Sequence, residues 1–186
     1  MKVTELPLEG LKLVELDVYR DDRGFFVERF HQAKFRELGL PLDFAQDNHS
    51  RSKPGVLRGL HFQFEPPQGK LVGALRGAIL DVAVDIRPDS PSFGEHYKVE
   101  LSADNGLLLW IPAGFAHGFY VLGDEEADVL YKVDGLYNPK SDSGIRWDDP
   151  ELKIPWPNPK PLLSAKDQQL MSFADYRAQG SAHFFK

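Results

Sequence analysis

The chain contains no cysteine and only two methionines among its 186 residues. The absence of cysteine excludes disulfides, thiolate metal ligands and cysteine nucleophiles. Long apolar runs are also absent, and no basic start is followed by an apolar segment. We therefore expect neither a membrane span nor a signal peptide. A cysteine-free chain also fits a cytoplasmic location.

An excess of basic charge is lacking as well, because the net charge is −6. Proteins that bind nucleic acid generally need a basic surface, so we expect no nucleic-acid partner. Five cations nevertheless fall close together in the sequence, at Arg51, Lys53, Arg58, Lys70 and Arg76. Local positive charge in an acidic protein suits one small anionic ligand, such as a phosphorylated metabolite. Solvated surface charge is the alternative interpretation.

Helical patterns are few, and hydrophobic residues mostly recur with a period of two. Many short strands separated by glycine-containing and proline-containing turns are typical of a β-sandwich or β-barrel. The length fits one domain, so we expect residues 1–186 to form a single all-β domain with a few short peripheral helices. The predicted strands are residues 14–19, 25–30, 56–63, 70–76, 79–86, 96–102, 107–111, 117–122 and 129–133.

Two short helices are predicted, over residues 31–38 and residues 165–176. Between them, residues 138–161 are rich in proline and aspartate and are predicted to wrap the strands as an ordered loop. In the strand of residues 79–86, apolar side chains share one face while Asp81 and Asp85 share the other.

The strand of residues 56–63 carries the first group of site-like residues. Alternation places His61 and Gln63 on one face. Arg58 falls on the opposite face, unless Gly59 marks a bulge that redirects it. Ionisable groups on a half-buried strand are costly unless they are paired or used, so this segment predicts a functional site.

A second such segment runs over residues 111–119, where a Pro-x-Gly turn leads to His117. Together the two segments resemble the paired motifs of the cupin barrels, whose H-x-H, glutamate and final histidine hold a metal. This chain has His61 and His117, but Gln63 and Gln68 stand at the other two positions. Two imidazoles and two amides are a weak ligand set for a divalent metal, so we expect no metal and no cofactor.

In place of a metal, an ammonium group can stabilise a developing enolate oxygen where water is excluded. Lys70 is the candidate for this role. Histidine acts as a base near neutral pH, and His61 would be assisted by a carboxylate, for which Asp81, Asp85 and Asp167 are candidates. An acid on the opposite side of the substrate carbon would complete an epimerising site, and Tyr131 could supply it.

At these positions the chain closely resembles the dTDP-4-dehydrorhamnose 3,5-epimerases, metal-free members of the cupin superfamily with a jelly-roll fold. The resemblance covers nearly the whole chain. The segments that carry it are residues 22–28, 46–48, 58–63, 68–72, 111–119, 144–147 and 163–167.

The resemblance implies that His61 is the general base with Asp167 as its partner, that Tyr131 donates a proton, and that Lys70 steadies the enolate. Tyr137 would stack on the thymine ring. Family members are homodimers whose N-terminal region reaches the partner, so Arg23 and Glu28 would serve the neighbouring site. The other implied substrate contacts are Gln46, Asp47, Asn48, Arg58, His117, Asp142 and Lys166. Asp142 departs from the glutamate that is usual in the family, so the implied substrate contact would be made by a shorter side chain or through water.

The implied reaction converts dTDP-4-dehydro-6-deoxy-D-glucose into dTDP-4-dehydro-L-rhamnose, on the route to dTDP-L-rhamnose, without a redox cofactor. Three alternatives stay open at this point. The chain could be a 3-epimerase only or a 3,4-ketoisomerase on the same dTDP-sugar. A metal-dependent cupin oxygenase or isomerase is the second alternative. The third is a cupin that binds a sugar nucleotide or carbohydrate without catalysis.

Overall fold

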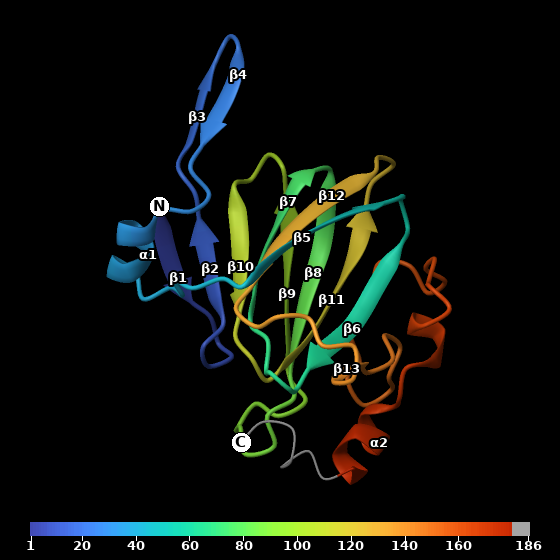
Figure 1. The fold of residues 1–186 in the computed structure, drawn as a ribbon. Helices are drawn as coiled ribbons and strands as arrows, with labels where there is room; N and C mark the ends of the chain where they lie inside the picture. The colour runs from blue at the N-terminus through green and yellow to red at the C-terminus, as the bar shows by residue number, and fades with distance from the viewer. Residues whose placement is uncertain (180–186) are drawn as a thin grey trace.

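Two antiparallel β-sheets lie face to face and enclose the largest apolar cluster (Figure 1). The computed structural model describes residues 1–179. The first sheet has six strands, which in spatial order are β1 (Lys2–Glu5), β2 (Lys12–Glu15), β10 (Leu107–Ile111), β7 (Lys70–Arg76), β12 (Ala127–Val133) and β5 (Gln46–Ser52). The second has five, which are β13 (Asp142–Gly144), β6 (Leu57–Gln63), β11 (Phe115–Leu122), β8 (Ala78–Asp85) and β9 (His96–Ser102).

Apolar side chains cover both faces of each sheet. Leu109 and Phe119 belong to the cluster between the sheets. The outer face of the six-stranded sheet is covered by the N-terminal region, including Phe35 of α1 (Gln32–Glu37). On the outer face of the five-stranded sheet lie Tyr176 and other residues of the C-terminal region. These layers confirm the predicted sandwich and its short peripheral helices.

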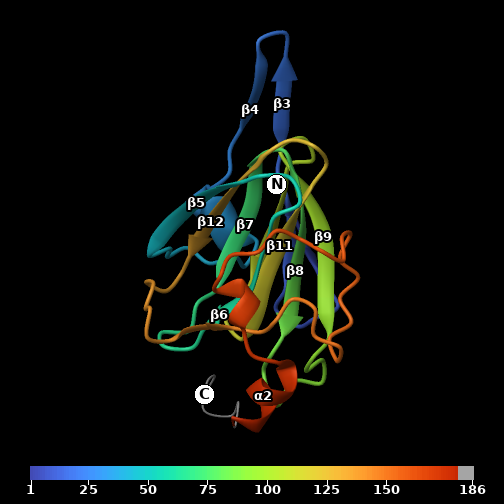
Figure 2. The same cartoon turned by 90° about the vertical axis from the view of Figure 1, so that its right-hand side faces the viewer.

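A third, two-stranded element projects away from the sandwich, at the opposite end from α2 (Phe173–Ala178) (Figures 1 and 2). It consists of β3 (Val18–Asp21) and β4 (Gly24–Val27). Its three aromatic side chains, Tyr19, Phe25 and Phe26, are all more than half exposed. Within residues 1–179, no helix has the length and apolar character needed to cross a membrane.

Four sequence predictions of secondary structure are wrong in part. The strand of residues 14–19 is divided between β2 and β3, and that of residues 25–30 ends at Val27. The helix of residues 165–176 is divided into a 3₁₀ turn, η1 (Asp167–Gln169), and α2, because Leu170 is extended and Ser172 caps α2. Predicted loop residues 138–161 include β13.

The strand of residues 79–86, observed as β8, is buried on both faces rather than one. Its two aspartates are fully buried. Asp81 pairs with His117, and Asp85 accepts hydrogen bonds from Arg87, Ser90 and Ser92. A central strand covered on both sides holds carboxylates only where such partners satisfy them.

A β-bulge in β6 resolves the orientation of Arg58. His61 pairs with His117 of β11 and Arg58 pairs with Phe119, so Gly59 and Leu60 together face the single residue Gly118. The extra residue places Arg58 on the same face as His61, because it reverses the alternation between them. Gly59 has φ +119°, and a Cβ there would lie 2.5 Å from the Gly118 Cα.

Replacing Gly59 with alanine is expected to destabilise the protein by about 3 kcal/mol, since the added methyl group collides with the β11 backbone. Urea unfolding measures this effect. Gly24→Ala is the matched control, because Gly24 also has a positive φ, +133°, but a Cβ there meets no atom within 4 Å. Equal losses in the two variants would show that backbone conformation, and not the contact with Gly118, sets the cost.

Candidate active site

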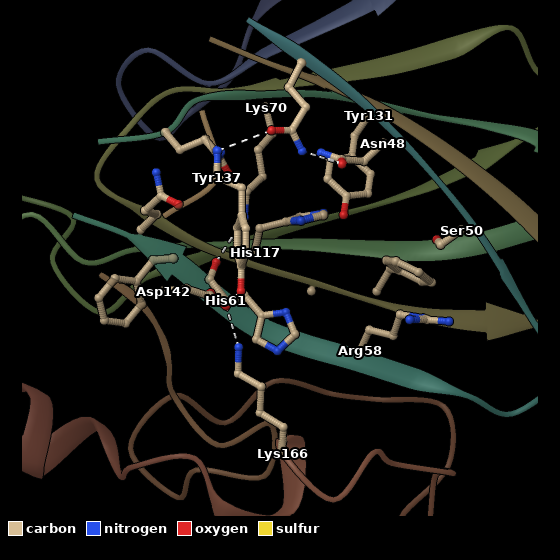
Figure 3. A pocket seen from close by; sticks show the side chains of 16 residues that line it. Asn48, Ser50, Arg58, His61, Lys70, His117, Tyr131, Tyr137, Asp142 and Lys166 are labelled. Atoms are coloured by element: carbon tan, nitrogen blue, oxygen red, sulfur yellow. Dashed lines mark hydrogen bonds and ion pairs between the residues drawn. The ribbon is translucent and has the colours of Figure 1, made fainter. Parts of the chain in front are cut away.

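A cavity of about 370 Å³ opens between the two sheets, on the side of β6 and of the edge strand β5. Both sheets contribute to it, and so do the segment after β12 and a residue just before η1 (Figure 3). Its lining residues are Gln46, Asn48, Ser50, Arg58, His61, Phe62, Gln63, Gln68, Lys70, His117, Gly118, Phe119, Tyr131, Tyr137, Asp142 and Lys166. Most of the site residues predicted from the sequence are therefore brought together.

His61 on β6 is bonded to a carboxylate behind the cavity wall. Its Nε2 lies 2.6 Å from Oδ1 of Asp167, which is 4% exposed. The Ser164 hydroxyl donates to the other carboxylate oxygen at 2.7 Å. Burial raises the pKa of Asp167, but the hydrogen bonds from His61 and Ser164 outweigh burial and hold the pKa below its usual value. Of the three candidate carboxylates, the structure places Asp167 beside His61.

Lys70 and Tyr131 face the cavity from the six-stranded sheet, opposite His61. Lys70 is 7% exposed, and its Nζ donates to the backbone oxygen of His61 at 3.2 Å. Burial lowers the pKa of Lys70 to about 8. Burial also raises the pKa of Tyr131, which keeps its phenol protonated. The cavity therefore has a base on one wall and a proton donor with an ammonium group on the other.

A second histidine–aspartate pair lies beside the first. His117 on β11 is the register partner of His61, and its Nε2 is 2.7 Å from Oδ1 of Asp81. Asp81 is fully buried, and its Oδ2 has no hydrogen-bond partner among residues 1–179. This pair explains why Asp81 is unavailable to His61.

One end of the cavity combines an aromatic ring with a charged pair. Asp142 accepts hydrogen bonds from the Lys166 ammonium at 2.6 Å and from the Tyr137 hydroxyl at 3.0 Å. The Tyr137 ring is 55% exposed. This arrangement offers a planar surface for stacking next to polar groups.

Arg58 lies toward the other end of the cavity, near Ser50 (Figure 3). Its guanidinium donates to the Ser52 hydroxyl at 2.9 Å and to the Arg51 carbonyl at 3.2 Å, which are both uncharged acceptors. An arginine held by neutral partners keeps its charge available for an anion.

Three of the five cations in the predicted positive cluster lie outside the cavity. Arg51 forms an ion pair with Asp128, and Arg76 lies 3.8 Å from Glu126. Lys53 does not line the cavity. Only Arg58 and Lys70 of the predicted cluster therefore line the cavity.

Three other predicted contacts also lie outside the cavity of this chain. Asp47 is on the outer face of β5, where it pairs with Lys132 at 2.7 Å. Arg23 is bonded to Asp21 at the tip of the hairpin, and Glu28 is bonded to Lys34. None of the three lines the cavity.

Four lining residues were not predicted from the sequence, namely Ser50, Phe62, Gly118 and Phe119. Ser50 follows Gln46 and Asn48 with a period of two on β5. This polar alternation was the available signal, but β5 was not predicted because strand recognition depends on alternating apolar residues. The Ser50 hydroxyl has no hydrogen-bond partner in the part of the chain that is described.

Comparison with known proteins identifies the kind of site. The family model of the dTDP-4-dehydrorhamnose 3,5-epimerases matches residues 5–175. The chain belongs to the dTDP-4-dehydrorhamnose 3,5-epimerase family. It is accordingly an isomerase that acts in dTDP-L-rhamnose biosynthesis, as sequence identities of about 50% to such epimerases show. The cupin-like fold of the family, predicted from the sequence, is confirmed.

Several members of this family are similar over nearly their whole length. The dTDP-4-dehydrorhamnose 3,5-epimerase of Pseudomonas aeruginosa is 53% identical over 177 residues, which covers 94% of this chain and 97% of that protein. A dTDP-4-dehydrorhamnose 3-epimerase of Streptomyces niveus is 38% identical and covers 97% of this chain and 87% of its own. The 3,5-epimerase from Legionella pneumophila, solved with dTDP-4-keto-L-rhamnose, superposes with a TM-score of 0.90 at 46% identity, covering 96% and 95% of the two chains.

Lys70→Met is expected to stabilise the protein at pH 7 by roughly 3 kcal/mol. Burying the charged ammonium group of lysine costs free energy, and methionine carries no charge. The folded pKa of about 8 lies below the usual 10.5, so this cost is full below pH 8 and disappears as the pH rises toward 10.5. Thermal unfolding at pH 7 and pH 10 measures the difference. Lys160→Met, at an exposed lysine, is the control. Equal stability of Lys70→Met and parent at pH 7 would contradict the expectation.

Proposed function

We propose that this chain epimerises C3 and C5 of dTDP-4-dehydro-6-deoxy-D-glucose to give dTDP-4-dehydro-L-rhamnose. The observation that carries the proposal is the placement of the His61–Asp167 pair on one sheet and of Tyr131 and Lys70 on the other, around one cavity. Inversion at carbon requires a proton to leave on one side and another to arrive on the opposite side. A cavity with its base and its acid on facing walls suits that requirement.

His61 is the general base. Its Nε2 is occupied by Asp167, so the proton from C3 or C5 passes to Nδ1. The C4 ketone acidifies both hydrogens, and the electron pair of the broken C–H bond moves into an enolate whose oxygen carries the charge. Asp167 stabilises the imidazolium that forms.

Lys70 stabilises the enolate oxygen. An ammonium group in a buried site interacts more strongly with developing charge than one in water. Tyr131 then returns a proton to the opposite face of the carbon. Its phenoxide recovers a proton from solvent, and the His61 imidazolium releases to solvent the proton that it took. No electrons leave the substrate, so the chemistry requires no redox partner.

The remaining cavity residues contact different parts of the substrate according to their charge and shape. Arg58 binds the diphosphate, and Tyr137 stacks on the thymine ring beside Asp142 and Lys166. Gln46, Asn48 and His117 line the region between and contact the nucleotide or sugar. The solved relatives support this assignment, since one holds dTDP-4-keto-L-rhamnose and another holds TDP.

The protein acts as a homodimer in this proposal. The hairpin of β3 and β4 projects from its own sandwich with exposed aromatic side chains (Figure 1). In the dimer it reaches the neighbouring site, where Arg23 and Glu28 complete the substrate contacts that they cannot make within their own protomer.

His61→Ala is expected to abolish exchange of the C3 and C5 hydrogens with deuterated water, because no other base replaces the imidazole. Incubation of the dTDP-sugar with parent and variant, followed by mass spectrometry and NMR, measures this exchange. Parent enzyme should incorporate two deuterium atoms. One deuterium would indicate a 3-epimerase, as in the Streptomyces niveus relative, and full exchange by His61→Ala would refute the role of the base.

In a pH profile, kcat/KM should fall as the pH rises through about 8, since it reports groups of the free enzyme and Lys70 loses its charge there. Lys70→Arg keeps a positive charge to higher pH. This variant should show lower activity but no decline near pH 8. A decline that stays at the same pH in Lys70→Arg would assign it to another group.

A further inference from the structure

Residues 134–138 carry Tyr137 into the cavity, and they are held there by amide hydrogen bonds from the opposite sheet and the turn that follows β6. The Gln63 side chain, 4% exposed, donates to the carbonyls of Pro66 and Leu136 at 2.8 and 2.9 Å. Its oxygen accepts the backbone N–H of Asn138 at 2.7 Å. One side chain thus fixes the backbone on both sides of Tyr137.

Gln68 makes a parallel contact nearby. Its amide donates to the Gly135 carbonyl at 2.7 Å. The backbones also approach closely here, because a Cβ on Gly135 would lie 2.8 Å from the Pro67 carbonyl oxygen. We call Gln63 and Gln68 the amide clamp. Neither residue has the acidity or basicity for proton transfer, and the hydrogen bonds of Gln63 all serve the backbone.

The clamp acts on the stacking surface and not on the reacting carbons. The backbone N–H of Tyr137 also donates to Gln46 Oε1 at 3.2 Å, and its hydroxyl donates to Asp142. The Tyr137 ring itself is 55% exposed, so few packing contacts hold it. Its position therefore depends on the backbone that the clamp fixes.

We propose that Gln63 and Gln68 are positioning residues that hold Tyr137 at the nucleotide end of the cavity and thereby set affinity for the dTDP part of the substrate. This inference rests on the proposed function, in which Tyr137 stacks on the thymine ring. Loss of the clamp raises KM and leaves the proton-transfer steps, made by residues elsewhere in the cavity, close to their parent rates.

The test uses Gln63→Glu, which has nearly the same shape but lacks the two N–H donors and places a negative charge against two carbonyls. Calorimetry with dTDP alone should show affinity reduced about 10-fold or more, whereas kcat at saturating substrate should stay within about threefold. Gln179→Glu, an exposed change at the end of α2, is the charge-matched control with parent affinity. Unchanged dTDP affinity in Gln63→Glu, or an equal fall in kcat and kcat/KM, would overturn the proposal.

A double-variant cycle separates positioning from general damage to the fold. In a Tyr137→Ala background, Gln63→Glu should cost less than about twofold in further dTDP affinity, because the ring that it positions is gone. Additive losses would overturn the proposal. If Gln63→Glu fails to fold, Gln68→Met is the variant to use. It removes the side-chain N–H that bonds to the Gly135 carbonyl and should weaken dTDP binding about threefold. Parent affinity in folded Gln68→Met would also overturn the proposal.

Failure of this inference is distinct from failure of the proposed function. If the parent enzyme exchanges hydrogen in the dTDP-sugar and Gln63→Glu binds dTDP with parent affinity, only the role of the amide clamp is refuted. Parent enzyme that neither binds dTDP nor exchanges hydrogen refutes the function on which the clamp rests.

Discussion

The close approach of Gly59 to Gly118 determines the geometry of the catalytic wall. Because two residues of β6 face one residue of β11, Arg58 and His61 point into the same cavity although their positions differ by an odd number. A regular strand would send one of them to the outer face. The bulge therefore brings a guanidinium and an imidazole onto one wall, and only glycine allows the two backbones to come so near.

Burial of charge is the second constraint. The buried carboxylate Asp167 and the buried Lys70 differ in how well hydrogen bonds compensate their charges. Asp167 is buried with hydrogen bonds that favour its charged form, so it can stabilise an imidazolium. Lys70 is buried with a single backbone acceptor, which leaves its charge poorly compensated. A charge without compensation in the resting enzyme interacts most favourably with an oxyanion that appears during the reaction.

The sequence was sufficient to predict the strands with alternating apolar residues. It was also sufficient to predict that His61 and His117 on these strands belong to the site. Prediction failed where a structural feature depends on residues that are distant in the sequence or on a pattern other than apolar alternation. β5 alternates polar residues towards a cavity and therefore has no apolar signal. The break between η1 and α2 depends on Ser172 capping the second helix. The orientation of Arg58 depended on register against β11, which no single strand reveals.

The order of the cavity residues along the chain has a consequence for how the site forms during protein synthesis. All strands of the two main sheets except the short β13 are complete at Val133, yet Tyr137, Asp142, Lys166 and Asp167 come later in the chain. During synthesis, the walls with His61, Lys70 and Tyr131 leave the ribosome before the carboxylate that orients the base. A chain that has not reached Asp167 therefore lacks the carboxylate that contacts His61, even when the strands of both walls are present. Turnover thus reports completed folding more stringently than any measurement of β-structure content.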